Sequence, residues 1–131
     1  MPVDHLGIAV KDLASTLPAW EATLGVRADP PEAVPAQRVR VAFLDAGNTH
    51  LELLEPTDPE SAVGRFLTQR GEGLHHVAFE VPDVTAALAA VEARGGRLVD
   101  RTARTGARGR RVGFAHPSAH HGVLVEFVQH P

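Results

Sequence analysis

The fold is decided by the stretch from Asp4 to Asp12, DHLGIAVKD, because the chain repeats it later as HHVAFEVPD, from His75 to Asp83. One offset of 71 positions relates five pairs of residues: His5 and His76, Val10 and Val81, Asp12 and Asp83, Gly25 and Gly96, and Phe43 and Phe114. After three additional residues the offset grows to 74, where LEL at 51–53 corresponds to VEF at 125–127. Because self-similarity at a fixed period indicates a repeated structural unit, we interpret the chain as two copies of one module.

Each module is expected to begin with a strand and a helix. Apolar residues alternate with polar or small ones over His5–Val10 and His75–Val81, which is the period of a half-buried strand. Asp12 and Asp83 are suited to cap the helices predicted over Leu13–Leu24 and Val84–Arg94, and glycines follow both helices. Pro18 lies inside the first of these helices and predicts a late start or a kink.

Three further strands are expected after each helix, at Val26–Ala28, Val39–Leu44 and His50–Leu54, and at Arg97–Val99, Arg111–Ala115 and Val123–Val128. The proline-rich stretch at 30–35 is interpreted as a loop, and Ser61–Arg70 as a short connecting helix. The sequence therefore predicts one α+β domain over residues 1–131. Its two paired βαβββ modules cover residues 4–56 and 74–130, and residues 57–73 form the linker helix.

Composition excludes several classes of function. A net charge of −3 leaves no basic footprint for nucleic acid. No apolar run approaches the roughly 20 residues of a membrane helix, and the first residues do not resemble a secretory signal. We therefore expect a cytoplasmic protein that binds neither nucleic acid nor membranes. The chain has no cysteine, so thiolate metal sites and cysteine nucleophiles are excluded.

Four polar residues interrupt the apolar pattern of the predicted strands, and they do so at equivalent positions of the two modules. They are His5 and Glu52 in the first module and His76 and Glu126 in the second. A buried glutamate without a partner is costly. Two imidazoles and two carboxylates, brought together by a pseudo-twofold, would make a four-ligand site for a divalent cation. Nitrogen and oxygen ligands suit Co, Mn, Ni, Zn or Fe, and the sequence does not choose among these metals.

This pattern resembles the vicinal-oxygen-chelate superfamily, which includes glyoxalases, bleomycin-resistance proteins and dioxygenases. Within it, the chain is most similar to the methylmalonyl-CoA epimerase family. The motifs that carry the resemblance are DHLGIAV at 4–10, LELLEP at 51–56, GEGLHHVA at 71–78, FAHP at 114–117 and GVLVE at 122–126. The resemblance implies paired βαβββ modules that form an open barrel around a metal.

The resemblance implies an isomerase that interconverts (2R)- and (2S)-methylmalonyl-CoA by 1,1-proton transfer through a metal-stabilised enolate. The family's metal ligands correspond to His5, Glu52, His76 and Glu126. Glu52 is commonly a glutamine in relatives. Epimerisation needs proton transfer on both faces of the reacting carbon. Glu126 is the expected acid–base group for one face.

The resemblance identifies the acid–base group for the other face less directly. Some relatives carry a glutamate at the position of Val41, and valine cannot transfer a proton. We expect Glu52 to take this role, with a water molecule or Gln37 as alternatives. For the acyl-CoA substrate, Arg108 in a glycine-interrupted basic loop is a candidate contact, and Ser118 stands where relatives often carry a lysine. The resemblance also implies a homodimer.

Three other activities remain as alternatives. A lactoylglutathione lyase (glyoxalase I) would use a metal set of the same order. An extradiol dioxygenase would use His5, His76 and Glu126 as a facial triad for Fe(II), but Glu52 would then block an open position. A metal-free drug-binding module of the bleomycin-resistance type would lack the full ligand set, whereas this chain has all four residues.

Overall fold

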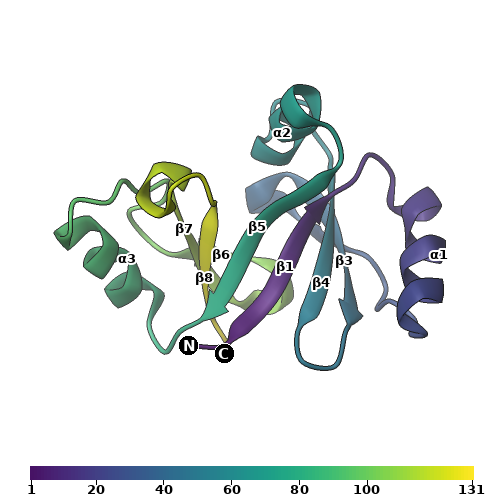
Figure 1. Cartoon of the computed structure of the whole chain (residues 1–131), viewed down its shortest axis with the longest axis horizontal. Helices are drawn as coiled ribbons and strands as arrows, with labels where there is room; N and C mark the ends of the chain where they lie inside the picture. The colour runs from purple at the N-terminus through teal and green to yellow at the C-terminus, as the bar shows by residue number, and fades with distance from the viewer. The chain divides into compact units, whose positions relative to one another are not determined.

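The computed structural model describes residues 1–131 and divides into two compact units. The first unit comprises His5–His75, and the second comprises Met1–Asp4 together with His76–Pro131. Figure 1 shows the helices and strands of both units with their labels. No helix has the length and apolar character needed to cross a bilayer.

In the first unit four strands are hydrogen-bonded side by side in the order β2-β3-β4-β1. Strand β1 is parallel to β4, and the other neighbours are antiparallel. In chain order the elements are β1 (Val3–Ala9), α1 (Leu13–Leu24), β2 (Glu32–Val34), a 3-10 turn at Pro35–Gln37, β3 (Val39–Asp45), β4 (His50–Pro56) and α2 (Ala62–Arg70).

The second unit repeats this arrangement with the strand order β5-β8-β7-β6. Strand β5 is parallel to β8, and the remaining pairs are antiparallel. Its elements are β5 (Gly73–Glu80), α3 (Val84–Ala93), β6 (Arg104–Thr105), a 3-10 turn at Ala107–Gly109, β7 (Arg111–Ala115), a 3-10 turn at Pro117–His120 and β8 (Val125–Gln129). The prediction of an α+β fold built from two βαβββ modules is confirmed.

The predicted aspartates cap the N-termini of helices α1 and α3. The Asp12 carboxylate accepts a hydrogen bond from Ser15 N at 3.0 Å, and that of Asp83 accepts one from Ala86 N at 3.2 Å. Each bond satisfies a backbone donor that has no partner within the helix. The late start predicted from Pro18 is wrong, since α1 begins at Leu13 and continues through the proline.

Two predicted strands are replaced by others. Residues 26–28 form no strand, because Ala28 N donates a hydrogen bond to the Glu21 carboxylate at 2.8 Å. This backbone N–H is therefore not available to pair with a neighbouring strand. The edge strand is instead β2, inside the proline-rich stretch interpreted as a loop. Likewise, Arg97–Val99 contributes only one isolated bridge, between Leu98 and Ala115, and the short β6 forms the edge of that sheet.

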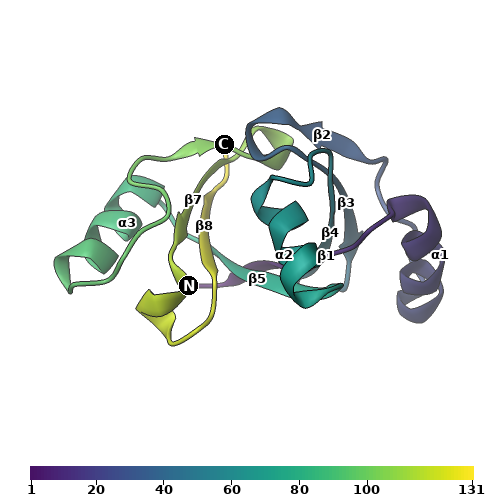
Figure 2. The same ribbon diagram turned by 90° about the horizontal axis from the view of Figure 1, so that it is seen from above.

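Each sheet has one apolar face that packs against its helix. In the first unit Leu13 of α1 lies among Ile8, Leu44, Leu51 and Leu53, and Figure 2 shows α2 on the other side of these strands from α1. In the second unit Val84, Leu88 and Val91 of α3 pack against Val125 and Phe127. The predicted polar positions therefore lie on the sheet faces that turn away from α1 and α3.

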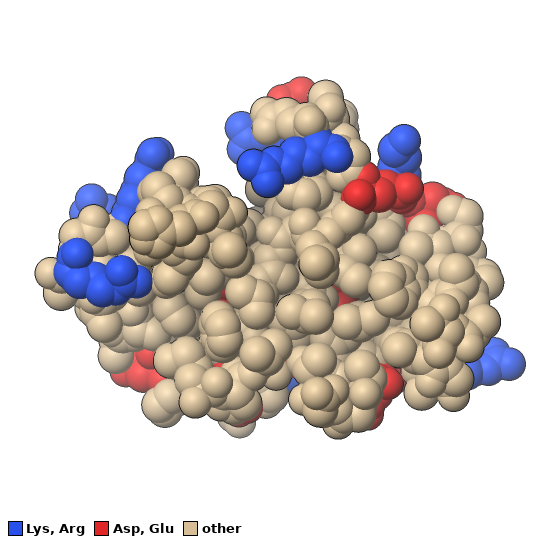
Figure 3. Space-filling view, in the orientation of Figure 1, with Lys and Arg blue, Asp and Glu red and all other residues tan.

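Charged side chains form no continuous patch on the face shown in Figure 3, where the basic residues lie in separate small groups.

Candidate active site

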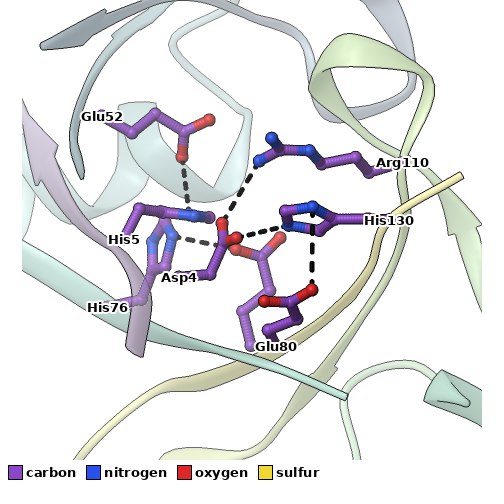
Figure 4. Close-up of polar contacts among 8 residues, drawn as sticks. Asp4, His5, Glu52, His76, Glu80, Arg110 and His130 are labelled. Atoms are coloured by element: carbon purple, nitrogen blue, oxygen red, sulfur yellow. Dashed lines mark hydrogen bonds and ion pairs between the residues drawn. The ribbon is translucent and has the colours of Figure 1, made fainter. Parts of the chain in front are cut away.

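In the first unit the sheet face opposite α1 carries a buried histidine–glutamate pair. His5 comes from β1 and Glu52 from β4, and Nε2 of His5 lies 3.2 Å from Oε1 of Glu52 (Figure 4). Gly7 is the residue of β1 in register with Glu52, so no β1 side chain lies directly beside the glutamate. His5 is 4% exposed and Glu52 is 6% exposed. The strand register thus brings the imidazole and the carboxylate together.

The second unit contains the same pair in the same local geometry. Nε2 of His76, from β5, lies 3.2 Å from Oε1 of Glu126, from β8. The small residue in register with this glutamate is Ala78, which corresponds to Gly7. His76 is 6% exposed and Glu126 is 3% exposed. The sequence repeat is therefore a repeat of a structural half-site.

A phenylalanine supports each half-site, and sequence reasoning gave it no role. Phe43 of β3 is in register with Glu52, and its ring lies edge-on to the His5 ring with centroids 6.0 Å apart. Phe114 of β7 is in register with Glu126 and meets the His76 ring in the same way at 5.4 Å. Edge-to-face contacts of this kind are favourable and restrict ring orientation. The signal for these residues was present in the sequence as their shared offset of 71.

The donor chemistry of the two half-sites suits a divalent cation. Each of the four residues offers one nitrogen or carboxylate oxygen, and all four are buried. Buried carboxylates and imidazoles are costly unless they are paired or coordinate a metal. In each unit the pairing places one nitrogen donor and one oxygen donor next to each other, which fits a metal that prefers nitrogen and oxygen ligands.

Val41, where the family resemblance led us to consider an acid–base residue, lies on the same sheet face as Glu52. It is in register with Leu54 in β4, two residues beyond Glu52, and side chains two residues apart share a face. Val41 is 1% exposed. The site face at this position is therefore apolar and tightly covered.

The three predicted substrate contacts lie in 3-10 turns. Gln37 ends the turn before β3 and is half-buried. Arg108 lies in the turn before β7 with φ of 59° and is also half-buried. Ser118 is exposed, and its Oγ lies 2.8 Å from Nδ1 of His116, which also accepts from Ser118 N at 3.1 Å. Ser118 thus has a local role in its turn, and contact of any of the three with substrate stays a prediction.

The second unit also contains a polar cluster that the sequence did not predict. Nε2 of His130 lies 2.6 Å from Oδ1 of Asp4, its Nδ1 lies 3.7 Å from Oε2 of Glu80, and Nη1 of Arg110 lies 3.3 Å from Oδ2 of Asp4 (Figure 4). The Arg110 guanidinium already supplies positive charge to Asp4, so we interpret this cluster as a structural clasp between the chain ends. Residues 126 positions apart give no local pattern from which it could be predicted.

Comparison with known proteins places this architecture in a family. The model of the Glyoxalase/Bleomycin resistance protein/Dioxygenase superfamily matches residues 4–114. The chain belongs to this superfamily, and the predicted vicinal-oxygen-chelate resemblance is confirmed.

Similar proteins narrow the comparison to a group of epimerases. The chain is 35% identical to the ethylmalonyl-CoA/methylmalonyl-CoA epimerase of Cereibacter sphaeroides, over 97% of this chain and 96% of that protein. It is 34% identical to the human mitochondrial methylmalonyl-CoA epimerase, over 97% of this chain and 73% of that protein. Among solved structures, a variant of Streptomyces coelicolor methylmalonyl-CoA epimerase in complex with 2-nitronate-propionyl-CoA has a TM-score of 0.91 and 41% identity. That match covers 98% of this chain and 94% of the epimerase chain.

Proposed function

We propose that this protein is a methylmalonyl-CoA epimerase, an isomerase that interconverts the (2R) and (2S) epimers by 1,1-proton transfer. The observation that carries the proposal is the repeated buried half-site, with an imidazole nitrogen 3.2 Å from a carboxylate oxygen in each module. Similarity to named epimerases over nearly the full chain supports the same activity.

We propose that His5, Glu52, His76 and Glu126 together hold one divalent cation. Co, Mn, Ni, Zn and Fe all suit these donors. When bound, such a cation would act as a Lewis acid toward the thioester and carboxylate oxygens of the substrate and so increase the acidity of its α-proton. The two carboxylates balance the charge of a divalent ion.

In this proposal the protein's own residues move the proton. The Glu126 carboxylate removes the α-proton as the electron pair of the C–H bond becomes the C=C bond of the enolate, whose charge rests on the thioester oxygen. An acid on the opposite face then returns a proton to the carbon, which completes the inversion. Burial of Glu126 keeps bulk water from its carboxylate, which favours transfer between the residue and the substrate.

Glu52 has two roles to separate. Its contact with His5 and its burial agree with metal ligation. The opposite-face acid–base role expected from the sequence, with Gln37 or water as alternatives, stays a prediction. A glutamine at position 52 would preserve an oxygen ligand but would remove the ability to carry a proton, so Glu52→Gln tests the two roles independently.

We propose that Gln37, Arg108 and Ser118 contact the acyl-CoA substrate. Arg108 is the candidate for a phosphate or the thioester arm, because a guanidinium binds phosphate through paired hydrogen bonds. A homodimer and a cytoplasmic location also stay predictions.

The lyase, dioxygenase and drug-binding alternatives receive no support from the three similar proteins described above, which are named methylmalonyl-CoA or ethylmalonyl-CoA/methylmalonyl-CoA epimerases. The lyase is the hardest to separate on chemistry alone, because it also uses a metal-assisted proton shift. The two activities differ in substrate, so a parallel assay distinguishes them.

Hydrogen exchange in D₂O tests the proposed function. Metal-loaded protein is incubated with (2S)-methylmalonyl-CoA, and in parallel with the hemithioacetal of methylglyoxal and glutathione. We expect α-deuterium incorporation and appearance of the (2R) epimer with the first substrate alone. Glu126→Gln should abolish both, whereas Glu60→Gln, at an exposed site, should leave them unchanged. Turnover of the hemithioacetal without exchange into the CoA ester would instead establish a lyase.

A further inference from the structure

We infer that Glu32 is the second acid–base residue of the proposed epimerisation, and this inference rests on the proposed function. Glu32 lies on the edge strand β2, within the proline-rich stretch that the sequence predicted to be a loop. It supplies the carboxylate that Val41 lacks, from the neighbouring strand.

The strand register places Glu32 on the face of the proposed site. Glu32 is the antiparallel partner of Val41, and Val41 is in turn the partner of Leu54. Directly paired residues project from the same face of a sheet, and so do residues two positions apart along a strand. Glu32 therefore shares a face with Glu52 and, through the pair in β1 and β4, with His5.

The burial pattern agrees with this orientation. In β2 the exposed residue is Ala33, whereas Glu32 is half-buried and Val34 is buried. Val41 and Leu54 lie beside Glu32 in the same row of cross-strand partners. Both are almost fully buried and form an apolar surface between Glu32 and Glu52. Strands β2 and β4 are two strand spacings apart, about 10 Å. A carboxylate at position 32 thus lies on the same sheet face as Glu52, two strands away, across an apolar surface.

Strand β2 is held firmly enough to position a side chain. Val34 pairs with Val39 at the start of β3, and Arg38 between them donates from its backbone N to Pro35 O at 3.1 Å. Nη1 of Arg38 lies 2.7 Å from Oδ2 of Asp58, and Thr57 N donates to Arg38 O at 2.9 Å. The turn that leads out of β2 is therefore tied to the segment after β4.

The chemistry distinguishes Glu32 from Glu52. Glu52 lies 3.2 Å from His5 within the proposed ligand set, whereas Glu32 is a half-buried carboxylate outside that set and can take up and release a proton. In one direction Glu32 accepts the α-proton and Glu126 donates one to the other face of the carbon. In the reverse direction the two residues exchange these roles, so each turnover transfers one proton off and one proton on.

The edge position of Glu32 has another explanation, which the experiment must separate. An inward-pointing charge on an edge strand discourages association through that edge. That role needs only a charge at position 32, and its loss would change assembly and stability. An acid–base role predicts a loss that depends on which epimer is supplied.

The test compares Glu32→Gln with Glu52→Gln, both isosteric, and uses Glu60→Gln as the exposed control. Each metal-loaded variant is incubated in D₂O with the (2R) and (2S) epimers of methylmalonyl-CoA separately, and both α-deuterium and inversion are followed. For Glu32→Gln we expect epimerisation to fall about 100-fold or more, the usual contribution of a general acid or base. Deuterium should still enter one epimer with retention of configuration, through Glu126, and should not enter the other.

Glu52→Gln should keep inversion and deuterium incorporation from both epimers. In the double variant Glu32→Gln/Val41→Glu, which returns a carboxylate to the same face, part of the epimerisation should recover. Epimerisation by Glu32→Gln at the wild-type rate would overturn the inference, and so would an equal loss of exchange from both epimers in a folded, metal-loaded variant. Absence of exchange in the wild-type protein would instead refute the proposed function.

Discussion

The two phenylalanines behind the imidazoles show how single residues fix the proposed ligands. Phe43 and Phe114 restrict His5 and His76 by edge-to-face contact, and both lie in register with the glutamate of the same half-site. A ligand whose ring is already oriented loses less freedom on binding a cation. Residues that surround metal ligands therefore influence affinity without touching the metal.

Replacement of Phe114 by leucine should weaken metal binding about tenfold, because contacts around the ligands typically contribute at least that factor. Isothermal titration with Mn²⁺ or Co²⁺ measures the change. Phe127→Leu is the matched control, since Phe127 is also buried in this unit but packs on the α3 side. It should lower stability and leave metal affinity unaltered. Equal affinities for the Phe114 variant and the wild-type protein would remove the orienting role.

His120 provides a pH-dependent prediction at the same scale. Burial, followed by the nearby charges of Arg94 and His121, lowers the pKa of His120 below its ordinary value of 6.5. A histidine with a lowered pKa in the folded state binds a proton more readily in the unfolded state. Folding stability therefore decreases as the pH falls through about 6.5 toward the lower folded-state value.

His120→Gln should reduce this acid sensitivity. We expect a smaller decrease in Tm between about pH 7.5 and 5.5 than in the wild-type protein, and melting curves across that interval measure it. His121→Asn, whose positive φ of 55° asparagine tolerates, should reduce the acid sensitivity by a smaller amount, because the charge of His121 contributes to the lowered pKa of His120. A steeper decrease in the His120 variant would reverse the sign and contradict the argument.

The residues that could be predicted from the sequence are those that break an apolar period. His5, Glu52, His76 and Glu126 stand out because the surrounding strand positions are apolar. Glu32 carries no such signal. Its strand has three residues, adjoins prolines, and is defined by pairing with β3 rather than by any local alternation.

At the scale of elements, the helices were more predictable than the edge strands. A helix start is encoded locally, and Asp12 and Asp83 cap α1 and α3 as expected. Whether a segment becomes an edge strand depends on the backbone hydrogen bonds that the neighbouring strand makes available. The sequence therefore predicted a strand at Val26–Ala28, whereas the ladder partner of β3 is the proline-flanked β2. Local strand propensity does not show which of the two segments pairs with β3.

The cap of α3 should make a measurable contribution to stability. Asp83→Ala removes the acceptor for Ala86 N and should lower the free energy of unfolding by about 1 kcal/mol. Asp83→Asn keeps a capping oxygen and should cost much less. Urea denaturation with a common m-value compares the two variants. Similar losses for both would mean that the charge of Asp83, and not its hydrogen bond, stabilises the helix.

At the scale of the whole molecule, duplication explains why the proposed site needs both modules. One module provides a single imidazole and a single carboxylate, which is too few donors to hold a divalent cation tightly. Two copies double the donors and leave coordination positions for a substrate. The sequence repeat predicted that each module supplies half of the donors, but it could not predict the side-chain packing around each histidine–glutamate pair.

This arrangement predicts one metal ion per chain and dependence on both halves. Titration with Mn²⁺ or Co²⁺ should reach one equivalent, and His5→Ala and His76→Ala should each abolish tight binding. His121→Asn, outside the ligand set, should keep it. Because the cation binds only the folded state, a hundredfold excess over Kd should stabilise the wild-type protein by about 2.7 kcal/mol and neither alanine variant. Two equivalents per chain, or full affinity in either alanine variant, would show that each module binds metal alone and that the shared site is wrong.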